Sequence, residues 1–334
     1  MCDPSVTIGI PVFNSVHYLS DALNSVLKQT IQSDSVEIIA VDDGSTDGSA
    51  AVLDRYADRH ANMRVFHQAN TGGPGAPRNR IIDEARGDFI FFLDADDYLG
   101  PRALERMTEM GAANGADIVI GKFVGVNGRT VATSLFRQNR PKTDIFQSNL
   151  FEAIGPTKMF RRQFLLDHRI RFPEGVGTAE DQPFMVRAYL LAKTVSVVAD
   201  VPCYYVVNRP GKEHASVQPV EPEQYYGMLE KSLKMIIRHV EDPGQQARII
   251  ANYLKKELTT GRSLQLEDGS RQPDEQDRWH TVFSQFTSQW ADSRVLDGLP
   301  PDMRRFIELA REKKLSEPLR PGLSPPVHSP KNPL

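Results

Sequence analysis

The sequence is nearly free of cysteine, since Cys2 and Cys203 are the only two in 334 residues. Two residues so far apart form neither a disulfide framework nor a zinc motif, and their scarcity favours a reducing compartment. Long apolar runs are also missing, because no stretch approaches the ~20 residues that cross a bilayer. The first residues lack the basic start and apolar core of a signal peptide. We therefore expect a cytoplasmic protein, and a peripheral contact with the inner face of the membrane is an alternative that the sequence allows.

An excess of basic charge is absent as well. The 40 Lys and Arg residues oppose 43 Asp and Glu, which gives a net charge of −3 and a pI near 6.3. This balance offers no electrostatic basis for nucleic acid as a partner. The 40% hydrophobic content and the length allow a large domain with a smaller one beside it.

Two common phosphate-binding motifs are missing. A dinucleotide fold needs G-x-G-x-x-G directly after its first strand, but that position holds Pro11-Val12-Phe13-Asn14. A P-loop needs Gly-Lys followed by Ser or Thr, and the sequence has no such run. Both classes of nucleotide site are therefore excluded.

The first hundred residues contain a regular alternation of strands and helices. Apolar runs predict buried strands at 6–13, 36–41, 64–69 and 89–93, and helical periodicity separates them. Strands that are joined through helices pair in parallel. We therefore predict an α/β fold, with a Rossmann-like, mostly parallel sheet flanked by helices.

Carboxylates follow the fourth of these strands. Asp94, Asp96 and Asp97 come directly after Leu93, at the edge where open α/β sheets bind ligands. Clustered carboxylates repel one another unless a cation neutralises them, and Mg²⁺ or Mn²⁺ can do so while it bridges substrate phosphates. The alternative is a solvated acidic turn. A phosphatase of the haloacid dehalogenase type also spaces two aspartates in this way, but Tyr98 stands where that motif has Thr or Val.

The rest of the chain predicts two further parts. A β-hairpin is indicated over residues 123–136, around Asn127-Gly128, and the sheet domain is expected to span residues 1–218. Amphipathic patterns predict a helical subdomain over residues 219–315, followed by a proline-rich, disordered tail over residues 316–334. The apolar faces of these helices could pack on the sheet domain or form a homo-oligomer, and the sequence does not decide between the two.

Four motifs, each after a predicted strand, resemble the signatures of family 2 glycosyltransferases. In chain order they are Pro11-Val12-Phe13-Asn14, Val41-Asp42-Asp43-Gly44-Ser45-Thr46-Asp47, Asn70-Thr71-Gly72-Gly73 and Asp94-Ala95-Asp96-Asp97. The resemblance covers residues 5 to about 210. It implies the GT-A fold and a nucleotide-sugar donor, here a UDP-sugar.

The resemblance implies a nucleotide pocket built from the ends of the first three strands. Pro11 and Phe13 correspond to the wall of this pocket. Asp42 or Asp43 corresponds to the acid that binds the base or the ribose. Asn70 and Gly72 correspond to the loop near the uracil.

The resemblance also implies a diphosphate and metal site. Arg78 corresponds to a residue that meets the diphosphate or holds the acidic cluster, and a surface salt bridge is the alternative. Asp94, with Ala95 next to it, corresponds to a residue that binds a ribose hydroxyl or supports the metal ligand from behind. Asp96 corresponds to the ligand of a Mn²⁺ or Mg²⁺ that bridges the diphosphate.

A second acidic pair lies in the run Gly175-Val176-Gly177-Thr178-Ala179-Glu180-Asp181-Gln182, just before a predicted helix. Asp181 is a helix cap in the simplest interpretation. Displacing a diphosphate from an anomeric carbon, however, requires a base that deprotonates the acceptor hydroxyl. The pair resembles the family's catalytic motif, which implies Asp181 as the base and Glu180 as its neighbour.

The loop after the last predicted strand supplies further candidates. Related enzymes often place a histidine here as a third metal ligand or as a diphosphate contact, which implies His214, although a solvated loop histidine is an equal alternative. Arg209 is placed to steady the diphosphate. Lys158 is expected to face the acceptor.

Taken together, the resemblance implies a metal-dependent, inverting glycosyltransferase. The Glu180-Asp181-Gln182 run and the helical region are most similar to bacterial enzymes that glycosylate the poly(ribitol phosphate) of wall teichoic acid, which implies N-acetylglucosamine as the sugar. The acceptor would be a glycan, a polyol phosphate or a lipid-linked molecule, and transfer to a polyisoprenyl phosphate is the rival within this class. A catalytically silent module that binds a nucleotide sugar is the rival from another class.

Overall fold

The structure, a computed structural model, describes residues 4–209, 220–260 and 272–312. The chain divides into two compact units, Met1–Val220 and Glu221–Leu334. The proposed tail over residues 316–334 lies outside the described residues, as does His214.

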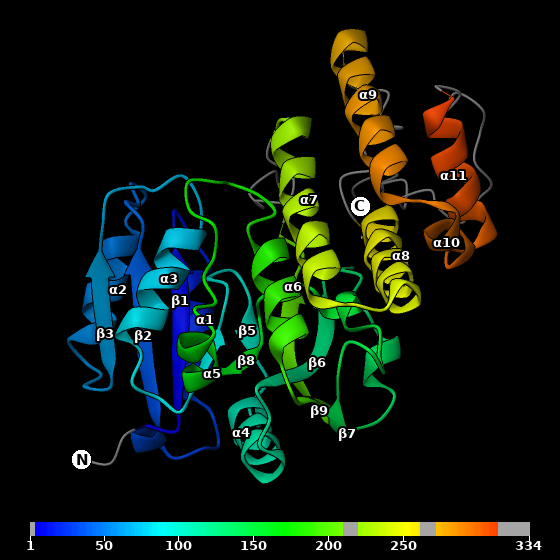
Figure 1. The fold of residues 1–334 in the computed structure, drawn as a ribbon. Helices are drawn as coiled ribbons and strands as arrows, with labels where there is room; N and C mark the ends of the chain where they lie inside the picture. Colours follow the sequence, from blue (N-terminus) through cyan, green and yellow to red (C-terminus); the bar gives the residue numbers. More distant parts are fainter. Residues whose placement is uncertain (1–3, 210–219, 261–271, 313–334) are drawn as a thin grey trace, which may run out of the picture. The chain divides into compact units, whose positions relative to one another are not determined.

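The first unit is built on one mixed sheet (Figure 1). Its strands are β1 (Val6–Val12), β2 (Val36–Asp42), β3 (Met63–His67), β4 (Phe89–Phe92), β5 (Tyr98–Leu99), β6 (Ile118–Val126), β7 (Arg140–Thr143), β8 (Met159–Arg161) and β9 (Val195–Val207). They lie in the order β3-β2-β1-β4-β8-β6-β9-β5, and β7 pairs with β9. β3, β2, β1 and β4 are mutually parallel, whereas β8 is antiparallel to both β4 and β6. The predicted α/β sheet is confirmed, and its mixed part begins after β4.

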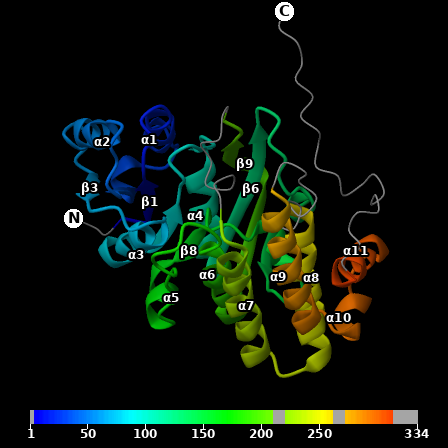
Figure 2. The ribbon, with the colours of Figure 1, turned by 90° about the horizontal axis from the view of Figure 1, so that it is seen from above.

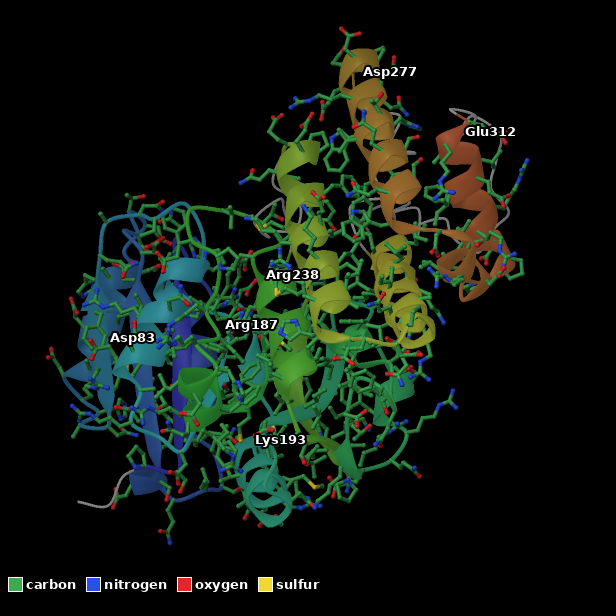
Figure 3. The ribbon with its side chains drawn as sticks, viewed as in Figure 1. Asp83, Arg187, Lys193, Arg238, Asp277 and Glu312 are labelled. Carbon is green, nitrogen blue, oxygen red and sulfur yellow. The ribbon has the colours of Figure 1, made fainter. Side chains whose placement is uncertain are left out.

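Helices cover both faces of the parallel half, because its strands are apolar on both sides. The helices of this unit are α1 (Leu19–Leu27), α2 (Ser49–Ala57), α3 (Gly75–Glu84), α4 (Ala103–Asn114), α5 (Arg162–Asp167) and α6 (Asp181–Leu191), with short 3₁₀ turns η1 (Ser33–Ser35), η2 (Ser134–Phe136) and η3 (Leu150–Ala153). Figure 2 shows α1 and α2 on one face of β1–β3 and α3 on the other. Charged side chains on the outside of this unit, such as Asp83 and Lys193, are exposed (Figure 3).

An aromatic cluster supports the end of β4. The ring centroid of Phe92 lies 5.9 Å from that of Phe160 on β8, 5.4 Å from that of Phe172 and 6.3 Å from that of Phe184 on α6. Edge-to-face contacts of this kind add to the burial of the rings. The cluster fixes β4, β8 and α6 to one another next to the acidic turn that follows β4.

The expected hairpin over residues 123–136 is wrong. Asn127 and Gly128 do form a turn, with φ of 54° and 77°, and β6 ends one residue earlier. The chain does not return along β6, however, because β6 pairs in parallel with β9, with an irregular register opposite Pro202. A long-range partner therefore replaces the local one.

The second unit is helical, as predicted. It contains α7 (Pro222–His239), α8 (Pro243–Thr260), α9 (Pro273–Trp290), α10 (Ser293–Asp297) and α11 (Pro301–Arg311). Proline at the first helical position suits α7, α9 and α11, because that N–H has no partner within a helix. The core is aromatic, with Tyr226 packing on Trp279, Phe283 and Phe286 of α9. In the described part of the chain, no helix is both long and apolar enough to cross a membrane.

Candidate functional site

The strand order reverses between β1 and β4, and open α/β sheets bind ligands at such a point. β1 pairs with β4 as far as Gly9 and Phe92, after which the two chains diverge. Pro11 stays in β1 opposite Val41, one residue before the strand ends. A missing N–H is tolerated there because the pairing with β4 has already stopped. Phe13 follows with 51% of its surface exposed, so that an apolar ring faces solvent at the strand's end.

The two carboxylates at the end of β2 are buried, with exposures of 4% for Asp42 and 3% for Asp43. Asp43 accepts hydrogen bonds from the Gln68 amide (2.7 Å) and from both the N–H (3.0 Å) and hydroxyl (2.9 Å) of Thr71. Asp42 accepts from the Ser45 N–H at 3.1 Å. Asp43 therefore holds the loop over residues 68–73 in place.

That loop carries the implied uracil-side residues. The Asn70 side chain accepts from the N–H of Gly72 at 2.9 Å, and Gly72 has a φ of +80°. Gly73 next to it lies so close to the chain before α6 that an added Cβ would be 2.1 Å from the Val176 carbonyl oxygen. The loop after β3 and the segment before α6 therefore pack backbone to backbone.

Arg78 of α3 joins three parts of the site. Its guanidinium donates to Glu180 at 2.7 Å and to Asp94 at 2.9 Å, and it lies over the Phe172 ring at 5.3 Å. Arg78 is 5% exposed. Burial alone would lower its pKa, but Asp94 and Glu180 outweigh that effect and raise it. The surface salt bridge considered for Arg78 is therefore wrong, because this is a buried bridge between the acidic turn and the second acidic pair.

The acidic turn after β4 gathers three carboxylates within four residues, Asp94, Asp96 and Asp97. Asp94 is paired with Arg78, whereas Asp96 is half-buried and Ala95 between them is buried. Asp97 is buried and accepts from the Val207 N–H at 2.8 Å. Burial, and then the charges of Asp94 and Asp96, raise the pKa of Asp97 to about 7.

A group of carboxylates at this edge of the sheet suits a divalent cation. Asp94 and Asp96 supply hard oxygen donors, and Mg²⁺ is typically held by one or two carboxylates together with substrate phosphates. Among the described residues, no three His, Cys, Asp or Glu side chains form a metal-binding group. The residues present therefore fit a cation that completes its coordination with the ligand, and the implied third ligand, His214, is not among the described residues.

The strand that leads toward His214 is tied to the acidic turn. Arg209 donates to the Asp96 carbonyl oxygen through Nε at 3.0 Å, and its guanidinium lies 4.2 Å from the centroid of the Tyr18 ring. The Tyr204 hydroxyl accepts from the Asp94 N–H at 3.2 Å. The segment at the end of β9 thus contacts the acidic turn at both Asp94 and Asp96.

The Glu180-Asp181 pair begins α6 after a strained residue. Ala179 has a φ of +58°, in the left-handed region that a residue with a Cβ rarely adopts. Glu180 is buried and bound to Arg78, whereas Asp181 is half-buried. Burial and the charge of Glu180 raise the pKa of Asp181 to about 7, although Arg78 and Lys158 act against them. A carboxylate that titrates near neutrality suits a general base.

Lys158 is not where the sequence analysis expected it. Its side chain is fully buried at the start of β8 rather than open to an acceptor. Its ammonium donates to the Gly155 carbonyl oxygen and lies 5.8 Å from the Phe123 ring centroid. The charge of Lys158 acts on Asp181 from within the protein.

The sequence analysis missed His67, the last residue of β3, which contacts Asp42 at 3.0 Å. It also missed Tyr204 and assigned no role to Thr71, because hydroxyl residues within an apolar strand or a loop carry no distinctive pattern. A histidine at the end of a strand whose neighbour is followed by Asp-Asp was the available signal for His67.

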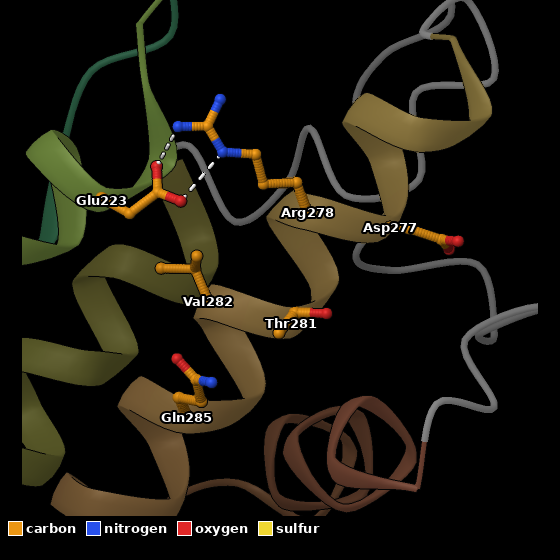
Figure 4. A pocket seen from close by; sticks show the side chains of 6 residues that line it. All are labelled: Glu223, Asp277, Arg278, Thr281, Val282 and Gln285. Atoms are coloured by element: carbon orange, nitrogen blue, oxygen red, sulfur yellow. Dashed lines mark hydrogen bonds and ion pairs between the residues drawn. The ribbon is translucent and has the colours of Figure 1, made fainter.

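A groove in the second unit lies along the first turns of α9 (Figure 4). It is lined by Glu223, Asp277, Arg278, Thr281, Val282 and Gln285. Arg278 is already paired with Glu223 at 2.7 Å and with Glu221 at 2.5 Å. This arrangement offers no base beside a cation site, so the catalytic candidates are those of the first unit.

Comparison with known proteins agrees with this location. Residues 7–169 match the glycosyl transferase family 2 model, and residues 222–320 match the glycosyl transferase TarS linker domain. The chain is 38% identical over 321 residues to the poly(ribitol-phosphate) beta-glucosyltransferase of Bacillus spizizenii, covering 92% of this chain and 50% of that protein. It is 30% identical to the poly(ribitol-phosphate) beta-N-acetylglucosaminyltransferase TarP of Staphylococcus aureus, covering 90% of this chain and 91% of TarP.

A solved structure extends the likeness to both units. The crystal structure of S. aureus TarS 1-349 in complex with UDP-GlcNAc superposes with a TM-score of 0.84 at 31% identity, covering 93% of this chain and 88% of that one. The chain spans about half the length of the first curated relatives that it matches, at 50% and 53%. With the family model on the sheet unit and a relative covered almost end to end, the chain belongs to glycosyl transferase family 2.

Proposed function

We propose that the chain transfers a sugar from a UDP-sugar to an acceptor hydroxyl, with inversion at the anomeric carbon. The observation that carries this proposal is the buried Arg78, which binds Asp94 at 2.9 Å and Glu180 at 2.7 Å. One guanidinium thereby couples a candidate cation and diphosphate site to a candidate base. A site that only binds a nucleotide has no need for the second part.

Asp181 acts as the base in this proposal. It removes the proton from the acceptor hydroxyl while that oxygen forms a bond to the anomeric carbon and the bond from that carbon to the diphosphate breaks, which releases UDP. Its pKa of about 7 leaves a large fraction ionised at neutral pH and still basic enough to take a proton. Glu180 positions the start of α6 through Arg78.

Asp96 and Asp94 would hold a Mn²⁺ or Mg²⁺, with His214 as a further ligand. Such an ion, when bound, neutralises charge on the departing diphosphate. Arg209 steadies the same region through the Asp96 carbonyl. The role of each of these residues is part of the proposal.

The nucleotide is proposed to lie between the ends of β1, β2 and β3. Phe13 offers an exposed ring for the base, beside Pro11. The buried Asp42 and Asp43 shape the pocket by holding the loop that carries Asn70 and Gly72. Their oxygens already accept hydrogen bonds inside the protein, so we propose that they act mainly by fixing this loop.

The named relatives favour poly(ribitol phosphate) as the acceptor. Their names specify β products, and a β product from an α-linked UDP-sugar requires inversion. One relative is named for glucose and others for N-acetylglucosamine. We propose N-acetylglucosamine, with glucose as the first competitor.

We further propose that residues 1–218 form the catalytic domain and residues 219–315 an accessory helical domain. Assembly through those helices, a peripheral membrane contact and a cytoplasmic location stay predictions, which light scattering and cell fractionation would check.

The test is UDP release and transfer to poly(ribitol phosphate) from a panel of UDP-sugars with Mn²⁺, with and without EDTA. One donor should turn over, and EDTA and Asp181→Asn should each abolish turnover. The matched control is Asp83→Asn, which removes an exposed carboxylate on α3. A UDP-sugar that binds without turning over, even with acceptor, would indicate the silent binding module.

A further inference from the structure

His67 bridges two carboxylates that belong to different elements. Its Nδ1 lies 3.0 Å from Oδ2 of Asp42 at the end of β2, and its Nε2 lies 3.0 Å from Oδ1 of Asp54 on α2. The Asp42 side chain is 5% exposed, whereas those of His67 and Asp54 are 44% and 61% exposed. One end of the bridge is therefore in the candidate nucleotide pocket and the other is on the outer surface.

Only the protonated ring satisfies both contacts. A neutral imidazole has one N–H, so its second nitrogen would point a lone pair at a carboxylate oxygen. The imidazolium donates to both. The hydrogen bond to Asp42 accordingly raises the pKa of His67, against burial, and Asp54 raises it further.

The charged groups around His67 come from three elements. Asp42 and Asp54 attract the proton from β2 and α2. Arg80 of α3 is the opposing cation, and its guanidinium lies 3.5 Å from the His67 carbonyl oxygen and over the ring of Phe66. The two carboxylates, which contact the ring itself, dominate.

Asp42 stands beside Asp43, and both are buried. Neutral groups bind Asp43, since its partners are an amide, a hydroxyl and a backbone N–H. The charged hydrogen-bond donor that the structure gives to this pair is His67. Its proton therefore balances negative charge at the place where the family likeness puts a nucleotide that is itself an anion.

We propose that His67 is a positioning residue of the donor pocket, whose imidazolium holds Asp42 and α2 together so that donor binding weakens when the ring loses its proton. This inference rests on the proposed function. Because the pKa of His67 is raised, the contribution is complete below about pH 6.5 and is lost as the pH rises beyond that value.

The experiment measures the affinity for UDP-N-acetylglucosamine and for UDP-glucose by calorimetry between pH 6 and 8.5. The diphosphate of these donors does not titrate in that range. We expect the wild-type Kd to rise about three- to tenfold across it, as one partly exposed charge-assisted hydrogen bond is lost. His67→Gln should bind as weakly at pH 6 as the wild type does at pH 8.5, with a flat profile.

Asp54→Asn is the more specific test of the His67 proton, because Asp54 is exposed and belongs to no proposed donor contact. It should move the midpoint of the affinity profile to lower pH. Asp58→Asn, which removes another exposed carboxylate near the end of α2, should leave the profile unchanged. The His67 ring protons, assigned through His67→Gln in NMR spectra, should titrate above pH 6.5 and shift downward in Asp54→Asn.

The failures of the two proposals differ. If a UDP-sugar binds with the same pH profile in His67→Gln as in the wild type, or if the ring titrates at or below 6.5, the role of His67 is wrong while the proposed function stands. If neither donor binds at any pH although the ring titrates high, the proposed function fails and the pocket role of His67 fails with it.

Discussion

Replacement of Arg78 by methionine tests the bridge at the centre of the site. The variant keeps an unbranched side chain of similar length but leaves Glu180 and Asp94 without their cation. The carboxylate of Glu180 is 8% exposed and that of Asp94 is 35% exposed, so the unpaired Glu180 accounts for most of the cost. Breaking a buried pair typically costs 3–5 kcal/mol, and we expect about 3 kcal/mol here, since water reaches Asp94.

A loss of that size should lower the melting temperature by about 6–12 °C for a unit of this length. The exposed pair of Arg171 and Asp83 is the matched control, with side-chain exposures of 36% and 59%. Arg171→Met should cost no more than about 1 kcal/mol. Thermal unfolding of both variants in EDTA measures the difference.

Activity should respond separately from stability. Arg78 lowers the pKa of Asp181, so its loss should move the acid limb of the pH–rate profile above 7 and reduce turnover at pH 7 by about tenfold or more. The double variant Arg78→Met/Glu180→Gln should recover stability but not activity, because it removes the unpaired buried charge without restoring the bridge. If Arg78→Met melts like the control or keeps the wild-type pH profile, Arg78 does not hold the two carboxylates together in the way inferred here.

Three further outcomes are expected. For the wild type, the turnover rate at saturating donor should rise with pH through about 7, because Asp181 must lose its proton, and a profile already flat at pH 5.5 would exclude it as the base. Because the folded state raises the pKa of Asp97 to about 7, its proton stabilises the fold at low pH, and this stability is lost as the pH rises from about 4 to 7. Denaturant titrations in EDTA should show that Asp97→Asn removes up to about 4 kcal/mol of the pH dependence of the unfolding free energy. If the unfolding free energy of Asp97→Asn changes with pH as it does in the wild type, the pKa of Asp97 is not raised. Gly73→Ala should weaken binding of UDP-sugar, because its Cβ would be 2.1 Å from the Val176 carbonyl oxygen. Gly177→Ala is the control, since its Cβ makes only an ordinary contact at 3.4 Å and binding should be normal. Equal affinities of the two variants in calorimetry would show that the site does not depend on the close packing of these two loops.

The parallel half of the sheet was predictable because its signals are local. Each strand is an apolar run, each ends in polar residues, and parallel pairing brings those ends to one edge. Pro11, Asp42 and Asp94 therefore fall near one another without any knowledge of side-chain contacts. The helical unit was predictable for the same reason, since its helices carry amphipathic periodicity and begin at prolines.

The features that the sequence did not predict depend on contacts between residues that are distant in the chain. The hairpin after Phe123 was wrong because β9, some 70 residues further on, supplies the partner of β6. The burial of Lys158 follows from the pairing of β8 with β4, two strands that are distant in the sequence. The contact of Arg78 with Glu180 joins two segments whose sequences give no sign of one another.

The most direct test of the account is a single assay of sugar transfer from UDP-N-acetylglucosamine to poly(ribitol phosphate), comparing the wild type with Asp181→Asn at equal donor occupancy. We expect a β-linked product from the wild type and none from the variant, with donor affinity within about twofold. Transfer by Asp181→Asn at the wild-type rate, or an α-linked product from the wild type, would contradict inversion by this base.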